Sequence, residues 1–162
     1  MRISLLNTLT TATVIGSAAV GGLFFAFSTL VMRGLNRIEP AAAITAMRGI
    51  NAEAQRSTPF LLLFFGSALA ALAVGIAATV QLRRRGSGYL LAGAILAIVA
   101  MLVTAAVNVP LNNQLDNADL TANAALVWQS YARPWTAWNH ARTLCPLIGA
   151  VLLTAGMLRR RQ

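Results

Sequence analysis

A short segment near the C-terminal end of the chain gathers side chains that can do acid–base chemistry. Residues 135–143 read Trp-Thr-Ala-Trp-Asn-His-Ala-Arg-Thr. The imidazole of His140 can exchange protons near neutral pH and act as a general base. The carboxamide of Asn139 and the guanidinium of Arg142 can stabilise an oxyanion formed when a substrate loses a proton. Trp135 and Trp138 offer aromatic walls, so the segment predicts a proton-abstraction site for a flat substrate.

A second polar stretch, Asn-Val-Pro-Leu-Asn at residues 108–112, can contribute to the same site. Pro110 cannot donate the helical hydrogen bond, so a backbone carbonyl near residue 106 is left free. The carboxamides of Asn108 and Asn112 flank that proline. We expect Asn108 to help stabilise an oxyanion, although a plain turn at the end of a helix accounts for the same residues.

Metal, haem and serine-nucleophile chemistry have little support in the sequence. His140 is the only histidine and Cys145 the only cysteine, five residues further on. The carboxylates are Glu39, Glu53, Asp116 and Asp119. Neither a bis-histidine haem nor a three-histidine metal centre can form within one chain, and no G-x-S-x-G turn is present. We expect no metal and no cofactor, with a metal shared between two protomers as the alternative.

Charge is distributed so that four long segments carry none. Apolar residues make up 57% of the chain and charged residues 10%, and about 20 apolar residues span a bilayer core. The sequence predicts an all-α integral membrane four-helix bundle, a single domain over residues 1–162, with amphipathic helices in the outward-facing loops. The membrane helices are expected near residues 4–32, 58–82, 87–109 and 135–158.

The fourth membrane helix must begin before Arg142 to be long enough. Counting about 20 residues back from Arg159 reaches Asn139, which places Asn139, His140 and Arg142 at or just inside the outer boundary of the membrane. Ionisable groups at that depth usually face protein or a water-filled cavity. A snorkelling Arg142 and tryptophans that anchor the helix at the interface are the simpler alternatives.

The net charge of +9 arises from arginines alone, and their positions predict the topology. Dense clusters at residues 83–85 and 159–161 abut the ends of membrane segments, which favours a cytoplasmic location for both termini in the cytoplasmic (inner) membrane. The loops 33–56 and 110–141 then face outward. Nucleic acid is excluded as a partner, because the arginines do not form a basic stripe with interleaved aromatics.

Two outward-facing loops should contain amphipathic helices. The 33–56 loop alternates apolar and charged residues at helical spacing. A second helix is expected from Leu120 to Ala132, with Asp119 as its N-cap. Trp128 and Tyr131 lie three residues apart and therefore share one face of that helix.

Four stretches of the sequence resemble a known family. They are Gly22–Met32, Met47–Asn51, Asn108–Asn112 and Trp135–Thr143. Together they look like the DUF1772, or anthrone oxygenase-like, family of small four-helix membrane proteins, and the resemblance spans nearly the whole chain. The Asn-x-Pro-x-Asn and Trp-Asn-His-x-Arg elements are its most specific parts. Some members of this family oxidise anthrones to anthraquinones with O₂.

The resemblance implies a cofactor-independent monooxygenase whose substrate is a small apolar aromatic compound. An anthrone has an acidic CH₂ group, and its anion can pass an electron to O₂ directly. On this interpretation His140 is the base, while Asn139, Asn108 and Arg142 stabilise the enolate and the peroxide. The residues expected to bind the substrate are Trp135, Trp138, Asn112, Asn51, Ser28 and Trp128.

Other functions are compatible with the sequence. A non-enzymatic membrane scaffold or small-molecule-binding protein could use the 135–143 segment only to lock the bundle. A transporter is less well supported, because no acidic residue lies inside the first three membrane segments. The lipid bilayer is an obligatory partner, and a homo-oligomer is compatible with the sequence.

Overall fold

The computed structural model of the chain describes residues 5–119 and 123–160, which form helices and short connections without any strand. The helices, with two π-helical turns labelled η, are α1 (Leu5–Ala26), η1 (Phe27–Val31), α2 (Met32–Leu35), α3 (Pro40–Arg56), α4 (Thr58–Val80), α5 (Ser87–Val103), η2 (Thr104–Asn108), α6 (Val109–Asp116) and α7 (Ala124–Arg159).

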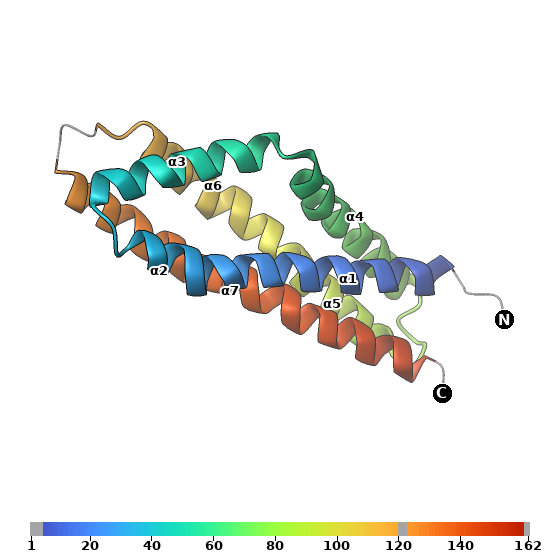
Figure 1. The fold of residues 1–162 in the computed structure, drawn as a ribbon. Helices are drawn as coiled ribbons and strands as arrows, with labels where there is room; N and C mark the ends of the chain where they lie inside the picture. The colour runs from blue at the N-terminus through green and yellow to red at the C-terminus, as the bar shows by residue number, and fades with distance from the viewer. Residues whose placement is uncertain (1–4, 120–122, 161–162) are drawn as a thin grey trace.

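Four helical stretches are long and apolar enough to cross a membrane. They are Leu5–Leu35, Thr58–Val80, Ser87–Asp116 and Ala124–Arg159. The protein is therefore an all-α integral membrane protein, as the sequence predicts. In Figure 1 the two chain ends and the turn between α4 and α5 lie at one end of the bundle, and α3 and α6 lie at the other. Which end faces the cytoplasm stays a prediction.

Glycines allow the central helices to approach closely. A Cβ atom on Gly93 of α5 would lie 2.8 Å from the carbonyl oxygen of Gly149 on α7, and a Cβ on Gly149 would lie 2.8 Å from the carbonyl oxygen of Gly93. Small residues at such crossings let two backbones pack directly, which stabilises helix pairs in lipid. Helix α7 thus packs closely against α5 along the bundle.

The amphipathic helix expected in the 33–56 loop is confirmed as α3. The Glu39 carboxylate caps it by accepting hydrogen bonds from the amides of Ala41 (3.0 Å) and Ala42 (3.2 Å). Its apolar face is buried, with Ile44 and Met47 fully inaccessible to solvent. Figure 1 shows α3 lying across the end of the bundle that is far from the chain ends.

An arginine fastens α3 to the neighbouring helix α6. The Arg48 guanidinium donates hydrogen bonds to the carbonyl oxygens of Leu115 (2.7 Å) and Ala118 (2.6 Å). These carbonyls lie at and just beyond the C-terminal end of α6, where the last carbonyl groups of a helix have no partner within the helix ladder. The end of the bundle is therefore closed by a tethered helix rather than by a free loop.

The prediction of a separate helix from Leu120 to Ala132 is wrong. Residues 120–122 lie outside the described part, and from Ala124 onward the chain belongs to α7, which runs without interruption to Arg159. Its N-cap is Asn123, which accepts from the amide of Leu126, and not Asp119. Pro134 is tolerated inside α7 because it removes only the bond to the carbonyl of Ser130, an exposed residue near the N-terminal end of the helix.

The third membrane helix also continues further than expected. Instead of ending near residue 109, it passes through the π-helical turn η2 into α6 and stays helical as far as Asp116. The amide of Val109 bonds to the carbonyl of Thr104, five residues earlier. Pro110 follows immediately, so the proline produces a local widening of the helix rather than its end.

Candidate active site

A cavity of about 630 Å³ lies at the end of the bundle covered by α3. Residues of α1, η1, α3, α4, η2, α6 and α7 contribute to its walls. Most of the walls are apolar and aromatic. Five of the residues that the sequence assigns to the site line it, namely Asn51, Asn108, Asn112, Trp135 and Arg142.

Arg142 places a buried positive charge in this cavity. The side chain is only 5% exposed, and its guanidinium carbon lies 3.7 Å from the centroid of the Phe24 ring and 5.4 Å from that of Trp135. Its Nε has no hydrogen-bond partner, and it forms no ion pair with the carboxylates of the described residues. Aromatic rings offset only part of the cost of burying a cation. The site is therefore suited to an anionic group.

Asn108 is held in the wall by the turn η2. Its carboxamide nitrogen donates a 3.3 Å hydrogen bond to the carbonyl oxygen of Trp135. The side chain is fully buried, and its Oδ1 has no hydrogen-bond partner, as is also true of Nδ2 of Asn51. Buried polar atoms without partners are uncommon in proteins and often mark places where a ligand or water binds. Besides Arg142, the residues that line the cavity thus include a buried acceptor atom on Asn108 and a buried donor atom on Asn51 without partners.

Asn139 supports the cavity from behind rather than lining it. Its Nδ2 donates to the carbonyl oxygen of Phe24 at 2.7 Å and to the Ser28 hydroxyl at 2.8 Å. Ser28 belongs to η1, the other of the two π-helical turns, and the side chains of Ser28 and Asn139 are both buried. Two π-helical turns therefore meet α7 at this level, a feature that frequently accompanies functional sites.

Asn112 organises two aromatic side chains of α7. Its Oδ1 accepts hydrogen bonds from the Tyr131 hydroxyl and from Trp135 Nε1, both at 2.9 Å. The rings of Trp128 and Tyr131 are 5.7 Å apart and those of Tyr131 and Trp135 6.3 Å apart. The expected shared face of Trp128 and Tyr131 is confirmed, since both belong to one buried cluster with Trp135.

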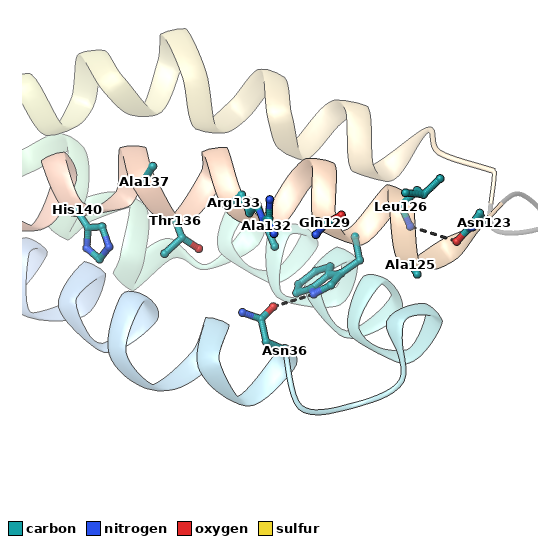
Figure 2. Close-up of a pocket in the computed structure, with 11 residues that line it drawn as sticks. Asn36, Asn123, Ala125, Leu126, Gln129, Ala132, Arg133, Thr136, Ala137 and His140 are labelled. Carbon is teal, nitrogen blue, oxygen red and sulfur yellow. Dashed lines mark hydrogen bonds between the residues drawn. The ribbon is translucent and has the colours of Figure 1, made fainter.

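Three of the residues assigned from the sequence lie elsewhere. His140 is exposed and lines a separate groove of about 720 Å³ that also includes Trp128. Figure 2 shows His140 and Thr136 on the side of α7 that faces the first membrane helix. Trp138 is 47% exposed and lines neither space. Because residues two apart on a helix differ by about 200°, His140 and Arg142 point to nearly opposite sides.

A hydrogen bond between two residues that line the groove lies between its His140 end and its Asn123 end. Trp128 Nε1 donates to Asn36 Oδ1 at 2.8 Å, drawn as a dashed line in Figure 2. This bond joins α7 to the turn after α2. The part of the chain that the structure describes holds no group of three His, Cys, Asp or Glu side chains able to bind a metal ion, either here or in the Arg142 cavity.

Sequence reasoning missed several residues of the Arg142 cavity. Phe60 and Phe64 of α4 and Glu53 of α3 line it, as do Phe24 and Phe27. The signal for Phe24 and Phe27 was present, since both fall in the Gly22–Met32 stretch that resembles the family. Nothing in the spacing of the α4 phenylalanines distinguishes those that face the cavity from those that face lipid.

The family to which the chain belongs follows from comparison with family models. The fold and site define a small four-helix membrane protein with a mainly apolar cavity near one end that contains a buried cation. The chain belongs to the anthrone oxygenase family, whose model matches residues 60–152. That range includes Asn108, Asn112 and Arg142. Searches of curated proteins and of solved structures give no match. Family and fold together indicate a membrane protein of the oxygenase-like kind.

Proposed function

We propose that the protein is a monooxygenase that oxidises an anthrone-like or similarly activated aromatic compound with O₂ in the Arg142 cavity. The observation that carries the proposal is the buried guanidinium of Arg142, which has no anionic partner among the described residues and lies on the Phe24 ring. Membership of the anthrone oxygenase family supports the type of reaction.

In this reaction the substrate first loses a proton from its CH₂ group, and the electron pair delocalises onto the adjacent carbonyl oxygen. Arg142 stabilises the resulting enolate electrostatically, which is most effective in a site of low dielectric constant. The Nδ2 of Asn51, buried without a partner, supplies a further donor. Trp135 and the phenylalanines hold the flat ring system.

The enolate then transfers one electron to O₂, and the two radicals combine into a peroxide. The peroxide loses water to give the new carbonyl group, so that one oxygen atom enters the substrate and the other leaves as water. Before it loses water, the peroxide anion takes up one proton in place of the proton lost in the first step, so the overall reaction consumes only the substrate and O₂. The residues of the chain are required to bind the substrate, favour its anion and exclude bulk water from it.

The sequence assigns the role of base to His140, which remains a proposal that needs its own test. His140 lines the groove on the opposite side of α7 from Arg142. The proposed function therefore rests on the Arg142 cavity and does not require His140 to touch the substrate. Trp138, which is half exposed, is likewise not required as a wall of the site.

The proposal is tested by O₂ uptake and quinone formation with anthrone and purified, chelator-treated protein in lipid nanodiscs. Replacing Arg142 by Gln removes the buried charge, and we expect the rate above the spontaneous reaction to fall at least tenfold. Arg133→Gln is the matched control, because Arg133 is an exposed arginine of the same helix. Binding of anthrone without any turnover would contradict the proposal and favour the small-molecule-binding alternative.

A further inference from the structure

The proposed oxygenation begins with a proton transfer, and the Arg142 cavity contains a suitable acceptor. Of the described residues that line it, two carry ionisable side chains, Arg142 and Glu53. Arg142 is buried, whereas Glu53 is exposed to solvent. The cavity thus has a cation in its interior and a carboxylate at its rim.

Helix α3 determines the position of Glu53. Its last turns contribute Ile50, Asn51, Glu53 and Ala54 to the cavity wall. The start of the helix is capped by Glu39 and its middle is fastened by Arg48 to the end of α6. Because α3 is fixed in this way, the carboxylate is presented by a regular helix rather than by a loop, which favours a defined geometry.

Other groups that could take the proton are placed less well. His140 lines the separate groove. The Tyr131 hydroxyl already donates its proton to Asn112. Glu39 accepts the capping bonds of α3 and does not line the cavity, and neither does Asp116.

We propose that Glu53 is the general base of the reaction, an inference that rests on the proposed function. The C–H bond of the substrate breaks, an O–H bond forms on the Glu53 carboxylate, and the electron pair remains in the enolate beside Arg142. A carboxylate is an effective base for carbon acids when an electrostatic partner stabilises the enolate. Because Glu53 is exposed, it returns its proton to water before the next turnover.

The proton transfer can be measured without oxidation. Under strictly anaerobic conditions in D₂O, a protein that deprotonates anthrone reversibly catalyses exchange of its CH₂ hydrogens for deuterium, which proton NMR follows directly. We expect the unmodified protein in nanodiscs to accelerate exchange, and Glu53→Gln to lower the acceleration at least tenfold. Asp116→Asn, which removes a carboxylate outside the cavity, should leave it unchanged.

A binding measurement separates loss of the base from loss of the fold. Anthracene-9-carboxylate is a flat anion that cannot be deprotonated further, and its fluorescence reports binding. Glu53→Gln should bind this probe at least as tightly as the unmodified protein, whereas Arg142→Gln should bind it more weakly. If Glu53→Gln binds the probe normally and loses exchange, the carboxylate acts in the proton transfer.

The outcomes for the base and for the proposed function are distinct. Exchange that survives in Glu53→Gln, or that is lost in His140→Gln instead, overturns the assignment of Glu53. Absence of exchange with the unmodified protein also overturns it, whatever the O₂ uptake. Exchange that requires Glu53 without any O₂ uptake in air supports the base and contradicts the oxygenase.

Discussion

The carboxamide of Asn139 is bonded to the main chain of Phe24, with 2.7 Å between Nδ2 and the carbonyl oxygen. Since the ring of Phe24 lies under the Arg142 guanidinium, this bond fixes the surface on which the buried cation rests. Phe24 belongs to α1 and Asn139 to α7, two helices that are distant in the sequence and adjacent in the bundle. Asn139 is therefore a positioning residue for the cavity rather than part of its wall.

Replacing Asn139 by Ala should weaken both the fold and the reaction. The change removes the hydrogen bonds to Phe24 and Ser28, and interhelical hydrogen bonds in a membrane protein contribute about 0.6 kcal/mol each on average, so the two together contribute about 1 kcal/mol. We expect the free energy of unfolding in mixed micelles to fall by about that amount and O₂ uptake to fall severalfold. Gln129→Ala, at an exposed position of α7, is the control. Unchanged stability and activity in Asn139→Ala would refute the positioning role.

Arg142→Met should make the protein more stable and inactive. An unpaired buried cation is costly, and replacing buried charges by apolar side chains of similar size is often stabilising by about 1–4 kcal/mol. The midpoint of thermal unfolding should therefore rise, while O₂ uptake and binding of anthracene-9-carboxylate are lost. A drop in stability would show that Arg142 serves the fold rather than a ligand.

The sequence predicts the four membrane helices and α3 well, because charge-free length and amphipathic spacing are local properties. The prediction of a break in the helix at Pro134 is wrong. The helix continues because Ser130 is exposed, so water can bind the carbonyl that Pro134 leaves without a donor. The sequence also leaves undecided which sides of α7 face inward. The turn of 100° per residue in a helix predicts that the side chains of His140 and Arg142 point to nearly opposite sides of α7. Only the packing of α7 against α1 and α5 determines which of the two side chains is buried.

His140→Gln should retain O₂ uptake within about twofold of the unmodified protein. The imidazole lines a groove that the Arg142 cavity does not share, so its loss removes no group from the proposed reaction. The measurement is the same uptake assay, with Glu53→Gln as the variant expected to fail. A tenfold or larger loss in His140→Gln would restore the histidine as the base and move the reacting substrate to the groove.

Adding one methyl group at Gly149 should destabilise the bundle, whereas the same change at Gly22 should not. The Cβ atom of Gly149→Ala would lie 2.8 Å from the carbonyl oxygen of Gly93, a backbone atom that cannot move without separating α5 from α7. Overpacking of this kind costs about 1–3 kcal/mol. At Gly22 nothing lies within 4 Å. Unfolding titrations of the two variants test the comparison, and equal stabilities would contradict the close helix crossing.

The orientation predicted from the arginine clusters can be tested by labelling single cysteines. With Cys145→Ser as background, Asn117→Cys and Gly88→Cys place thiols at exposed positions at opposite ends of the bundle. Because the dense clusters at residues 83–85 and 159–161 favour the cytoplasmic side, a membrane-impermeant maleimide should label Asn117→Cys in intact cells and Gly88→Cys only after permeabilisation. The reverse pattern would place α3 and the Arg142 cavity at the cytoplasmic end, so the substrate would reach the site from inside the cell.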